Sequence, residues 1–179
     1  MHQLTLGASY STPDWDGPTD GSWPLVPSRA AGLDRLSAFI AKGGRDYQTH
    51  RNTDLGSGRH GHVSLLSPYL RHRLINETEV LSQVLAEHSQ SEAFKFIQEV
   101  FWRSYWKGWL EQRSLLWPEY QQQLPGILQR ATQNRRQSDD YNAAVNAATH
   151  IPLFNEWCEE LVGSGYLHNH ARMWFASIW

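Results

Sequence analysis

The chain has 179 residues, of which 40% are hydrophobic and 19% charged, so it can form one domain with its own core. Its formal net charge of -2 excludes a uniformly basic surface, and any patch that binds nucleic acid must therefore be local. The single cysteine, Cys158, excludes an internal disulfide. The sequence contains no run of about 18 apolar residues that could span a membrane, so a cytoplasmic protein is expected.

The N-terminal segment differs in character from the rest of the chain. Residues 1–30 combine Gly, Ser, Pro and Asp without helical or alternating periodicity, which predicts an extended arm with turns. We expect Trp15, Trp23 and Leu25 to hold this arm against the body. Helical patterns follow, and no segment shows the strict alternation that is typical of a strand. The sequence therefore predicts an all-α protein, with an arm at 1–30 and one helical domain at 31–179.

The helical patterns are separated by short breaks and one long loop. Gly43 and Gly44 end the first helix, and a loop rich in Gly, Asn, Arg and His then runs to about Val63, a length typical of functional loops. Pro118 and Pro125 interrupt the polar region 111–148, which predicts short surface helices there. Helices are expected, in chain order, at 29–40, 67–75, 76–88, 91–113, 152–161 and from 168 onward.

Two serines precede the helix expected at 67–75. Ser64 and Ser67 are three residues apart, and Pro68 follows Ser67 directly. Hydroxyls beside the free backbone N–H groups of a helix N-terminus make a site for phosphate. An ordinary N-cap explains a Ser-Pro pair equally simply, so both interpretations stay open at this point.

The segment 94–110 is the most aromatic in a chain that holds nine tryptophans. Apolar residues cover most of its circumference, which predicts a buried central helix: Phe94, Phe96, Ile97, Val100, Phe101, Tyr105 and Trp109. Within that surround, Glu99, Trp102, Arg103 and Trp106 form one row. An ordinary pair between Glu99 and Arg103 accounts for the two charges but not for their place among aromatics, where desolvation is costly. A concave polar site is favoured.

The closing helix repeats this combination of polar and apolar groups. Asn169, Arg172, Met173 and Ala176 share a face through their i, i+3, i+4, i+7 spacing, over which a flat ring could lie. A contact between two helices is the alternative.

Histidines are numerous, yet their spacing does not favour a metal site. His168 and His170 point to different sides of a helix, and His60 and His62 have no carboxylate or cysteine spaced with them. We therefore expect no bound metal.

Four segments in this order resemble the helical FAD-binding domain of the photolyase and cryptochrome family: RDYQTHRN, VSLLSPYLRHRLI, FIQEVFWRSYWKGWL and THIPLFNEWCEELVGSGYLHNHARMWFAS. The resemblance implies light-driven electron transfer from FAD, with repair of cyclobutane pyrimidine dimers in DNA as one outcome. It implies that the dimer is contacted by Glu99, Trp102, Asn169 and Met173. It implies that FAD is contacted by Tyr47, Ser64, Ser67, Phe96, Arg103, Arg172, Met173 and Ala176.

The resemblance covers only the N-terminal part of that domain. The family's antenna domain and its remaining flavin-contacting elements have no counterpart, so a fragment or one half of a split protein is expected, with the complementary C-terminal half as partner in cis or in trans. His170 replaces an Arg that would help to grip DNA phosphate. Three functions stay open: a photolyase-like lyase acting on damaged DNA, a blue-light photoreceptor or flavin-binding module without repair, and a helical interaction protein without flavin.

Overall fold

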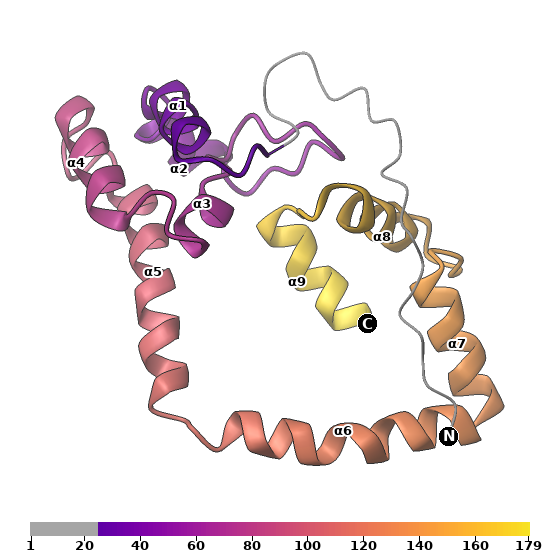
Figure 1. The fold of residues 1–179 in the computed structure, drawn as a ribbon. Helices are drawn as coiled ribbons and strands as arrows, with labels where there is room; N and C mark the ends of the chain where they lie inside the picture. The colour runs from indigo at the N-terminus through magenta and orange to yellow at the C-terminus, as the bar shows by residue number, and fades with distance from the viewer. Residues whose placement is uncertain (1–24) are drawn as a thin grey trace.

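The computed structural model describes residues 25–179, except for the side chains of residues 131 and 132. Over that range the chain forms helices without any strand, which confirms the predicted all-α class (Figure 1). None of the described helices is long and apolar enough to cross a membrane. The helices are α1 Arg29–Ile40, α2 Arg45–His50, α3 Ser67–Arg71, α4 Glu77–Glu87, α5 Phe94–Glu111, α6 Leu116–Gln133, α7 Arg135–Val145, α8 Pro152–Ser164 and α9 Asn169–Ile178.

The main core lies among α1 to α4 and the first two turns of α5, which we call the N-terminal cluster. Its centre is a group of three rings, Phe39, Tyr47 and Phe96, whose centroids are 5.1–5.9 Å apart. Leu25 packs against this core as expected, whereas Trp15 and Trp23 lie outside the described residues. The core also contains Leu36, Leu66, Tyr69, Leu70, Ile75, Val80, Val84, Ala93 and Val100.

The helix starts of the N-terminal cluster are fixed locally. Ser28 caps α1 by accepting a hydrogen bond from the backbone N–H of Ala31 at 3.2 Å. Asn76 and Glu79 form a reciprocal capping box at the start of α4, with both N···O distances at 2.9 Å. Short polar side chains at these positions satisfy N–H groups that the helices themselves leave unpaired.

The second half of α5 departs from the expected buried central helix. Phe96 is 3% exposed, but Phe101 is 56% exposed, and Trp102, Tyr105 and Trp106 are also exposed. The helices that pack against α5 are α2 and α4, and both lie at its N-terminal end (Figure 1). The prediction of burial along the whole helix was therefore wrong, because an apolar circumference is buried only where a neighbour is present.

The region after α5 also differs from the expected short helices. α6 runs for 18 residues with Pro125 inside it, and only α7 packs against it in a substantial way. A proline removes the hydrogen bond to the carbonyl four residues earlier, here that of Gln121. Gln121 is exposed, so water can satisfy that carbonyl and the helix continues. Pro125 does not act as the predicted breaker.

The last two helices fold back toward the N-terminal cluster (Figure 1). Gly165 ends α8 in the left-handed region at φ 68°, as its position after the last helical residue predicts. Phe154 of α8 is fully buried and stacks on Phe175 of α9 at a centroid distance of 5.0 Å. In the described residues α9 thus packs against α8 through one face and leaves much of its remaining surface exposed.

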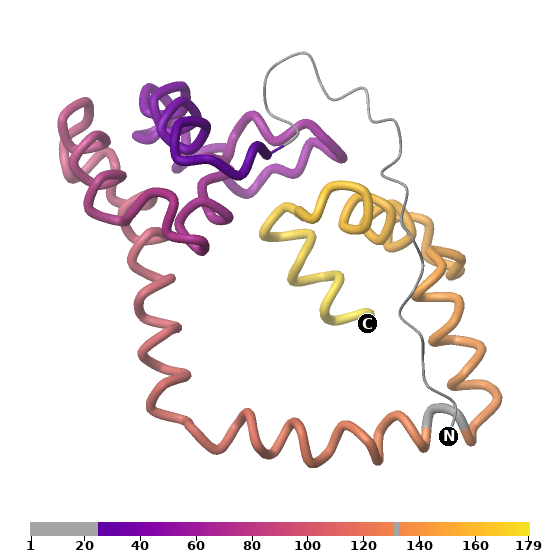
Figure 2. The backbone as a smooth tube through the Cα atoms, in the orientation of Figure 1, coloured from indigo at the N-terminus to yellow at the C-terminus, as the bar shows by residue number. Residues whose placement is uncertain are grey.

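The long loop between α2 and α3 connects the N-terminal cluster with α8 and α9 through hydrogen bonds, and its path can be followed in Figure 2. His60 Nε2 lies 2.8 Å from Glu160 Oε1 of α8, and both side chains are almost fully buried. His168 Nε2 bonds to the carbonyl oxygen of Arg51 at 3.1 Å, and His170 Nε2 to Asn52 Oδ1 at 2.8 Å. The loop carries all three of these bonds, and its functional role stays a prediction.

Candidate functional site

A cavity of about 220 Å³ lies where the N-terminal cluster meets α9. Its walls come from α2, from residues 63–66, from the starts of α3 and α9, and from one face of α5. Eight residues that the sequence proposed for a site line this one cavity: Tyr47, Ser64, Ser67, Phe96, Glu99, Arg103, Asn169 and Arg172.

The serine segment has an unusual backbone. Leu65, which follows Ser64 in the sequence, has a positive φ of 55°, and Leu66 is in the right-handed region. Consecutive residues of opposite hand turn their N–H groups toward one point, which makes a concavity suited to an anion. A left-handed leucine costs about 1–2 kcal/mol. Its side chain is 3% exposed and packs with Tyr166, and this burial offsets the cost.

The two serine hydroxyls do not cap α3. Leu66 occupies the N-cap position and no side chain bonds to the first turn, so the ordinary Ser N-cap is not what the structure shows for Ser67. Ser64 Oγ accepts a long hydrogen bond of 3.4 Å from Leu66 N–H. Because α3 has only five residues, the backbone concavity at Leu65 is a stronger feature than its helix dipole.

The charges on α5 pair with other elements rather than with each other. Glu99 accepts a hydrogen bond from Arg51 Nη1 at 2.5 Å, and Arg103 Nε lies 3.4 Å from Glu77 Oε1. The alternative of an ordinary pair between Glu99 and Arg103 within one helix is therefore wrong. Arg103 Nε is buried and makes no hydrogen bond of good geometry with any residue that the structure describes. Arg103 itself is one of the residues that line the cavity.

Two tyrosines near the cavity stay protonated at neutral pH. Burial raises the pKa of Tyr47 to about 12, and the Glu99 carboxylate adds to that rise. Burial likewise raises the pKa of Tyr166 to about 12, against a smaller opposing effect of Arg172. Both phenols are therefore hydrogen-bond donors over the physiological range.

The α9 side of the cavity is held by local bonds. Arg172 Nη2 donates to the carbonyl of Leu167 at 2.9 Å, and its guanidinium lies 5.6 Å from the centroid of the Tyr166 ring. His168 caps α9 by accepting from His170 N–H at its Nδ1 atom. These contacts position Asn169 and Arg172 at the first turns of the helix.

Three of the sequence-predicted residues do not line the cavity. Trp102 is 40% exposed and stacks on Trp106, with ring centroids 6.4 Å apart. Met173 is 61% exposed, and Ala176 is also exposed. They share helices with lining residues but are directed to the surface beside the cavity.

Sequence reasoning missed Arg51 and Tyr166. Arg51 holds Glu99, and Tyr166 forms part of the lining and packs on Leu65. Arg51 follows Tyr47 by four residues, a spacing that puts both on one side of a helical turn, and this signal was present in the sequence. Tyr166 follows the Gly165 turn and had no periodic signal.

A larger cavity of about 510 Å³ lies on the other side of Ser64, between α1 and the loop. It shares only Val63, Ser64 and Leu65 with the cavity described above. Ser64 is the only one of the sequence-predicted site residues in its lining. The smaller cavity is therefore the candidate site.

Comparison with known proteins gives one relevant relative. No protein-family model and no solved structure matches the chain. A deoxyribodipyrimidine photo-lyase of Synechococcus sp. is 29% identical over 176 residues, and the match covers 92% of this chain. The same match covers 33% of the relative, so the chain spans about a third of that protein's length. The similarity supports a photolyase-like protein at a distant level, and the helical fold agrees with it.

Proposed function

We propose that the chain forms one wall of a flavin-binding, photolyase-like site for light-driven electron transfer. The observation that carries the proposal is the cavity itself, since eight residues from four separate sequence segments line it. These are the segments on which the resemblance to photolyases rests. Distant similarity to a photo-lyase over most of the chain supports the same assignment.

The donors in the cavity fit the charged part of a dinucleotide. The Ser64 and Ser67 hydroxyls, the N–H groups at Leu65 and Leu66, and Arg103 offer donors for phosphate oxygens. At about 220 Å³ the cavity is below the roughly 300–1,000 Å³ of ordinary ligand pockets. We therefore propose that a complementary C-terminal half of the domain, in cis or in trans, supplies the other wall.

The remaining polar residues suit a substrate beside the cofactor. When bound, a reduced flavin would supply the electron that opens a pyrimidine dimer. The Asn169 amide would hydrogen-bond a pyrimidine carbonyl, and Arg51 fixes the Glu99 carboxylate at the edge of the same cavity. Trp102 and Met173, which are exposed, would offer apolar surface to an extruded pyrimidine dimer.

One observation favours a flavin-binding photoreceptor or module without DNA repair. His170 bonds to Asn52, so the position expected to hold a cation for DNA phosphate holds a hydrogen-bonded imidazole instead. The net charge of -2 gives no general attraction to DNA. In this alternative the protein binds flavin but does not bind DNA.

Titration of FAD into the chain, alone and with the complementary half of a photolyase added, tests the proposal. A variant with Ser64→Ala and Ser67→Ala should bind FAD roughly tenfold more weakly or worse, since two hydrogen bonds of about 1 kcal/mol each are lost. Ser104→Ala, on an exposed position of α5, is the matched control. Equal affinity of all three proteins, or no FAD binding even with the added half, would contradict a flavin site here.

Repair is tested separately, on the flavin-loaded assembly. Glu99→Ala and Asn169→Ala should reduce light-dependent repair of dimer-containing DNA while flavin content stays unchanged. Flavin binding without repair of single- or double-stranded substrate would leave the photoreceptor alternative.

A further inference from the structure

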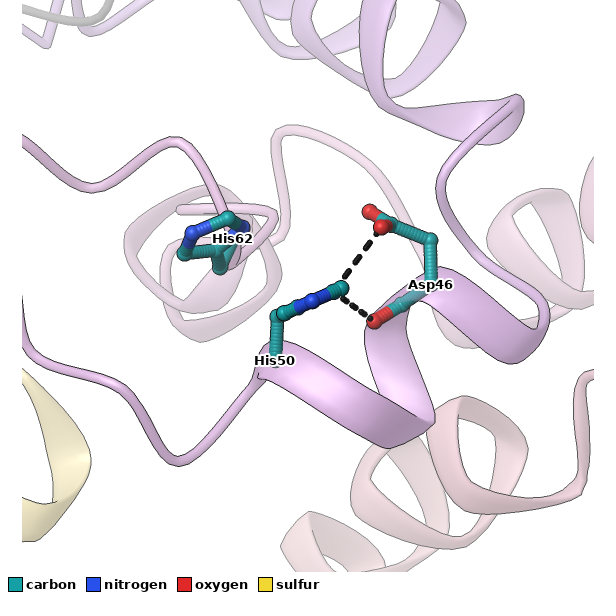
Figure 3. Close-up of side chains that lie close together, drawn as sticks. All are labelled: Asp46, His50 and His62. Carbon is teal, nitrogen blue, oxygen red and sulfur yellow. Dashed lines mark hydrogen bonds and ion pairs between the residues drawn. The ribbon is translucent and has the colours of Figure 1, made fainter.

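Outside the cavity, three potential metal ligands meet on the far side of α2. Asp46 and His50 are one helical turn apart on α2, and His62 reaches them from the end of the long loop (Figure 3). One ligand atom from each residue lies within 4.8 Å of the other two. We propose that Asp46, His50 and His62 bind a divalent transition-metal ion, with zinc as the best fit.

The three side chains lie close together, and His50 is bonded to Asp46. His50 Nδ1 lies 2.9 Å from Asp46 Oδ1, as the dashed line in Figure 3 shows. The rings of His50 and His62 face each other, with centroids 4.9 Å apart and 24° between their planes. Bonds of about 2.0–2.1 Å to zinc place tetrahedral ligand atoms about 3.3 Å apart. To meet that requirement the two stacked rings would turn their nitrogen atoms toward one point, and the exposure of His50 and Asp46 leaves room for this.

The type of ligand selects the ion. Two imidazoles and one carboxylate suit zinc and its neighbours, whereas magnesium and calcium prefer oxygen alone. Three protein ligands leave a fourth position for water, which is the pattern of an open zinc site. The Asp46 and His50 side chains are 44% and 45% exposed, so the ion has a direct path from solvent.

The nearby cations do not compete for this centre. Arg45, next to Asp46, pairs with Glu92 at 3.2 Å. Lys42, whose Nζ donates to the carbonyl of Gly61 at 2.9 Å, is engaged with the loop backbone. Neither contact involves a proposed ligand. Among the described residues, the Asp46 carboxylate forms an ion pair with His50 and with no arginine or lysine.

Metal binding would act on the cavity through the backbone. It would fasten residue 62 to α2 and close the loop between them, which reduces the conformational freedom of residues 51–61. Tyr47 and Arg51 lie on or directly after α2, and Ser64 follows His62 by two residues. An ion at this position would therefore stiffen the wall that carries them.

The test is titration of the purified chain with Co²⁺ as a visible probe, followed by displacement with Zn²⁺. We expect one equivalent of Co²⁺ to give the intense visible bands of a four-coordinate site, and Zn²⁺ to abolish them. His50→Ala and His62→Ala should each lower the affinity by about tenfold or more, since a ligand is lost. His72→Ala, an exposed histidine at the end of α3, is the matched control and should bind as the wild type does.

A second measurement guards against variants that fail to fold. Zn²⁺ should shift the ring resonances of His50 and His62 in the wild-type NMR spectrum and leave those of His72 in place. Absence of saturable binding by the wild type, equal binding by His62→Ala and His72→Ala, or ring shifts confined to other histidines would each overturn the proposal.

Discussion

The N-terminal cluster and the stretch from Phe101 through α6 both contain aromatic side chains, but in opposite environments. Phe96 and Phe101 are five residues apart on one helix, and they are 3% and 56% exposed. Phe96 contacts the rings of Phe39 and Tyr47, whereas Phe101 contacts no other aromatic ring among the described residues. The difference shows that aromatic composition sets what a helix can bury, and neighbouring elements decide what it does bury.

The exposed stretch has the character of an interaction surface. Trp102, Tyr105 and Trp106 contact one another along α5, and Trp117 stacks on Tyr120 at the start of α6. Each of these five side chains is at least 40% exposed. An apolar surface of this kind on a soluble domain usually marks a site of association. The comparison between the two regions can be tested by substitutions in each.

The largest effect is expected for Phe96→Ala. Removing a buried ring leaves a cavity between α1, α2 and α5, and such losses cost about 3–5 kcal/mol. Phe101→Ala, on the same helix, should change the free energy of unfolding by less than about 0.5 kcal/mol. Urea denaturation followed by far-UV circular dichroism measures both. Similar losses for the two variants would show that the exposed half of α5 is covered in solution.

The next effect concerns the junction between the loop and α8. Glu160→Ala should cost about 3 kcal/mol, because it leaves the buried His60 without its partner. His60 Nδ1 already has no hydrogen-bond partner among the described residues, so the ring would lose its one polar contact.

Glu159→Ala provides the control for this junction, since Glu159 is the exposed neighbour of Glu160. It should be nearly neutral in the same denaturation experiment. Glu160→Gln, which keeps a hydrogen-bonding side chain, should lose less than Glu160→Ala. If Glu160→Ala and Glu159→Ala were equally stable, the pair would not hold the two regions together.

A smaller effect is expected at the start of α4. Asn76→Ala removes the capping box and should cost about 1 kcal/mol, by the usual cost of losing such a cap. Asn76→Ser, which can still accept from Glu79 N–H, should recover most of the loss. Because neither partner titrates near neutral pH, the cost should be the same at pH 5.5 and pH 7.5. A strongly pH-dependent cost would contradict this account of the cap.

The smallest effect is expected at the corresponding cap of α9, and it depends on pH. Burial lowers the pKa of His168 below the ordinary value of a histidine side chain. The neutral ring donates from Nε2 to Arg51 and accepts at Nδ1 from His170, and protonation removes that acceptor. The contribution to stability is therefore complete above about pH 6.5 and decreases as the pH falls through the folded-state pKa.

Urea midpoints at pH 7.5 and pH 5.5 measure this contribution. His168→Asn, which retains a neutral capping group, should show a weaker loss of stability on acidification than the wild type. His72→Asn, at an exposed position, should behave as the wild type does. If the wild type became more stable than His168→Asn on acidification, the proposed role of the neutral His168 ring would be contradicted.

Much of the fold was readable from the sequence where local signals are strong. The helices expected at 29–40 and 76–88 agree with α1 and α4 to within a residue, whereas α8 continues three residues beyond the expected end at 161. The prediction that Pro125 would break the helix was wrong. The free-energy cost of a proline inside a helix depends on whether the carbonyl that loses its hydrogen bond faces water, and the sequence alone does not show this. The burial of α5 misled for a related reason, since its neighbours are set by tertiary structure.

The candidate site was only partly readable. Motif resemblance selected eight residues that meet in one cavity, although their chemical roles remain predictions. The partners of the two α5 charges could not be read, because Arg51 and Glu77 reach them across tertiary distances. The expected absence of a metal rested on sequence spacing around His62, whereas Asp46 and His50 approach it only through the fold.

The bonds between the long loop and the last two helices have a consequence for the order of folding. They join residues 100, 117 and 118 positions apart, whereas the caps and turns of the N-terminal cluster are local. Contacts of high sequence separation form late, because the intervening chain must first lose its freedom. The cavity between the cluster and α9 is therefore completed after most helices exist, and a ligand that binds both walls would act on the last step of folding.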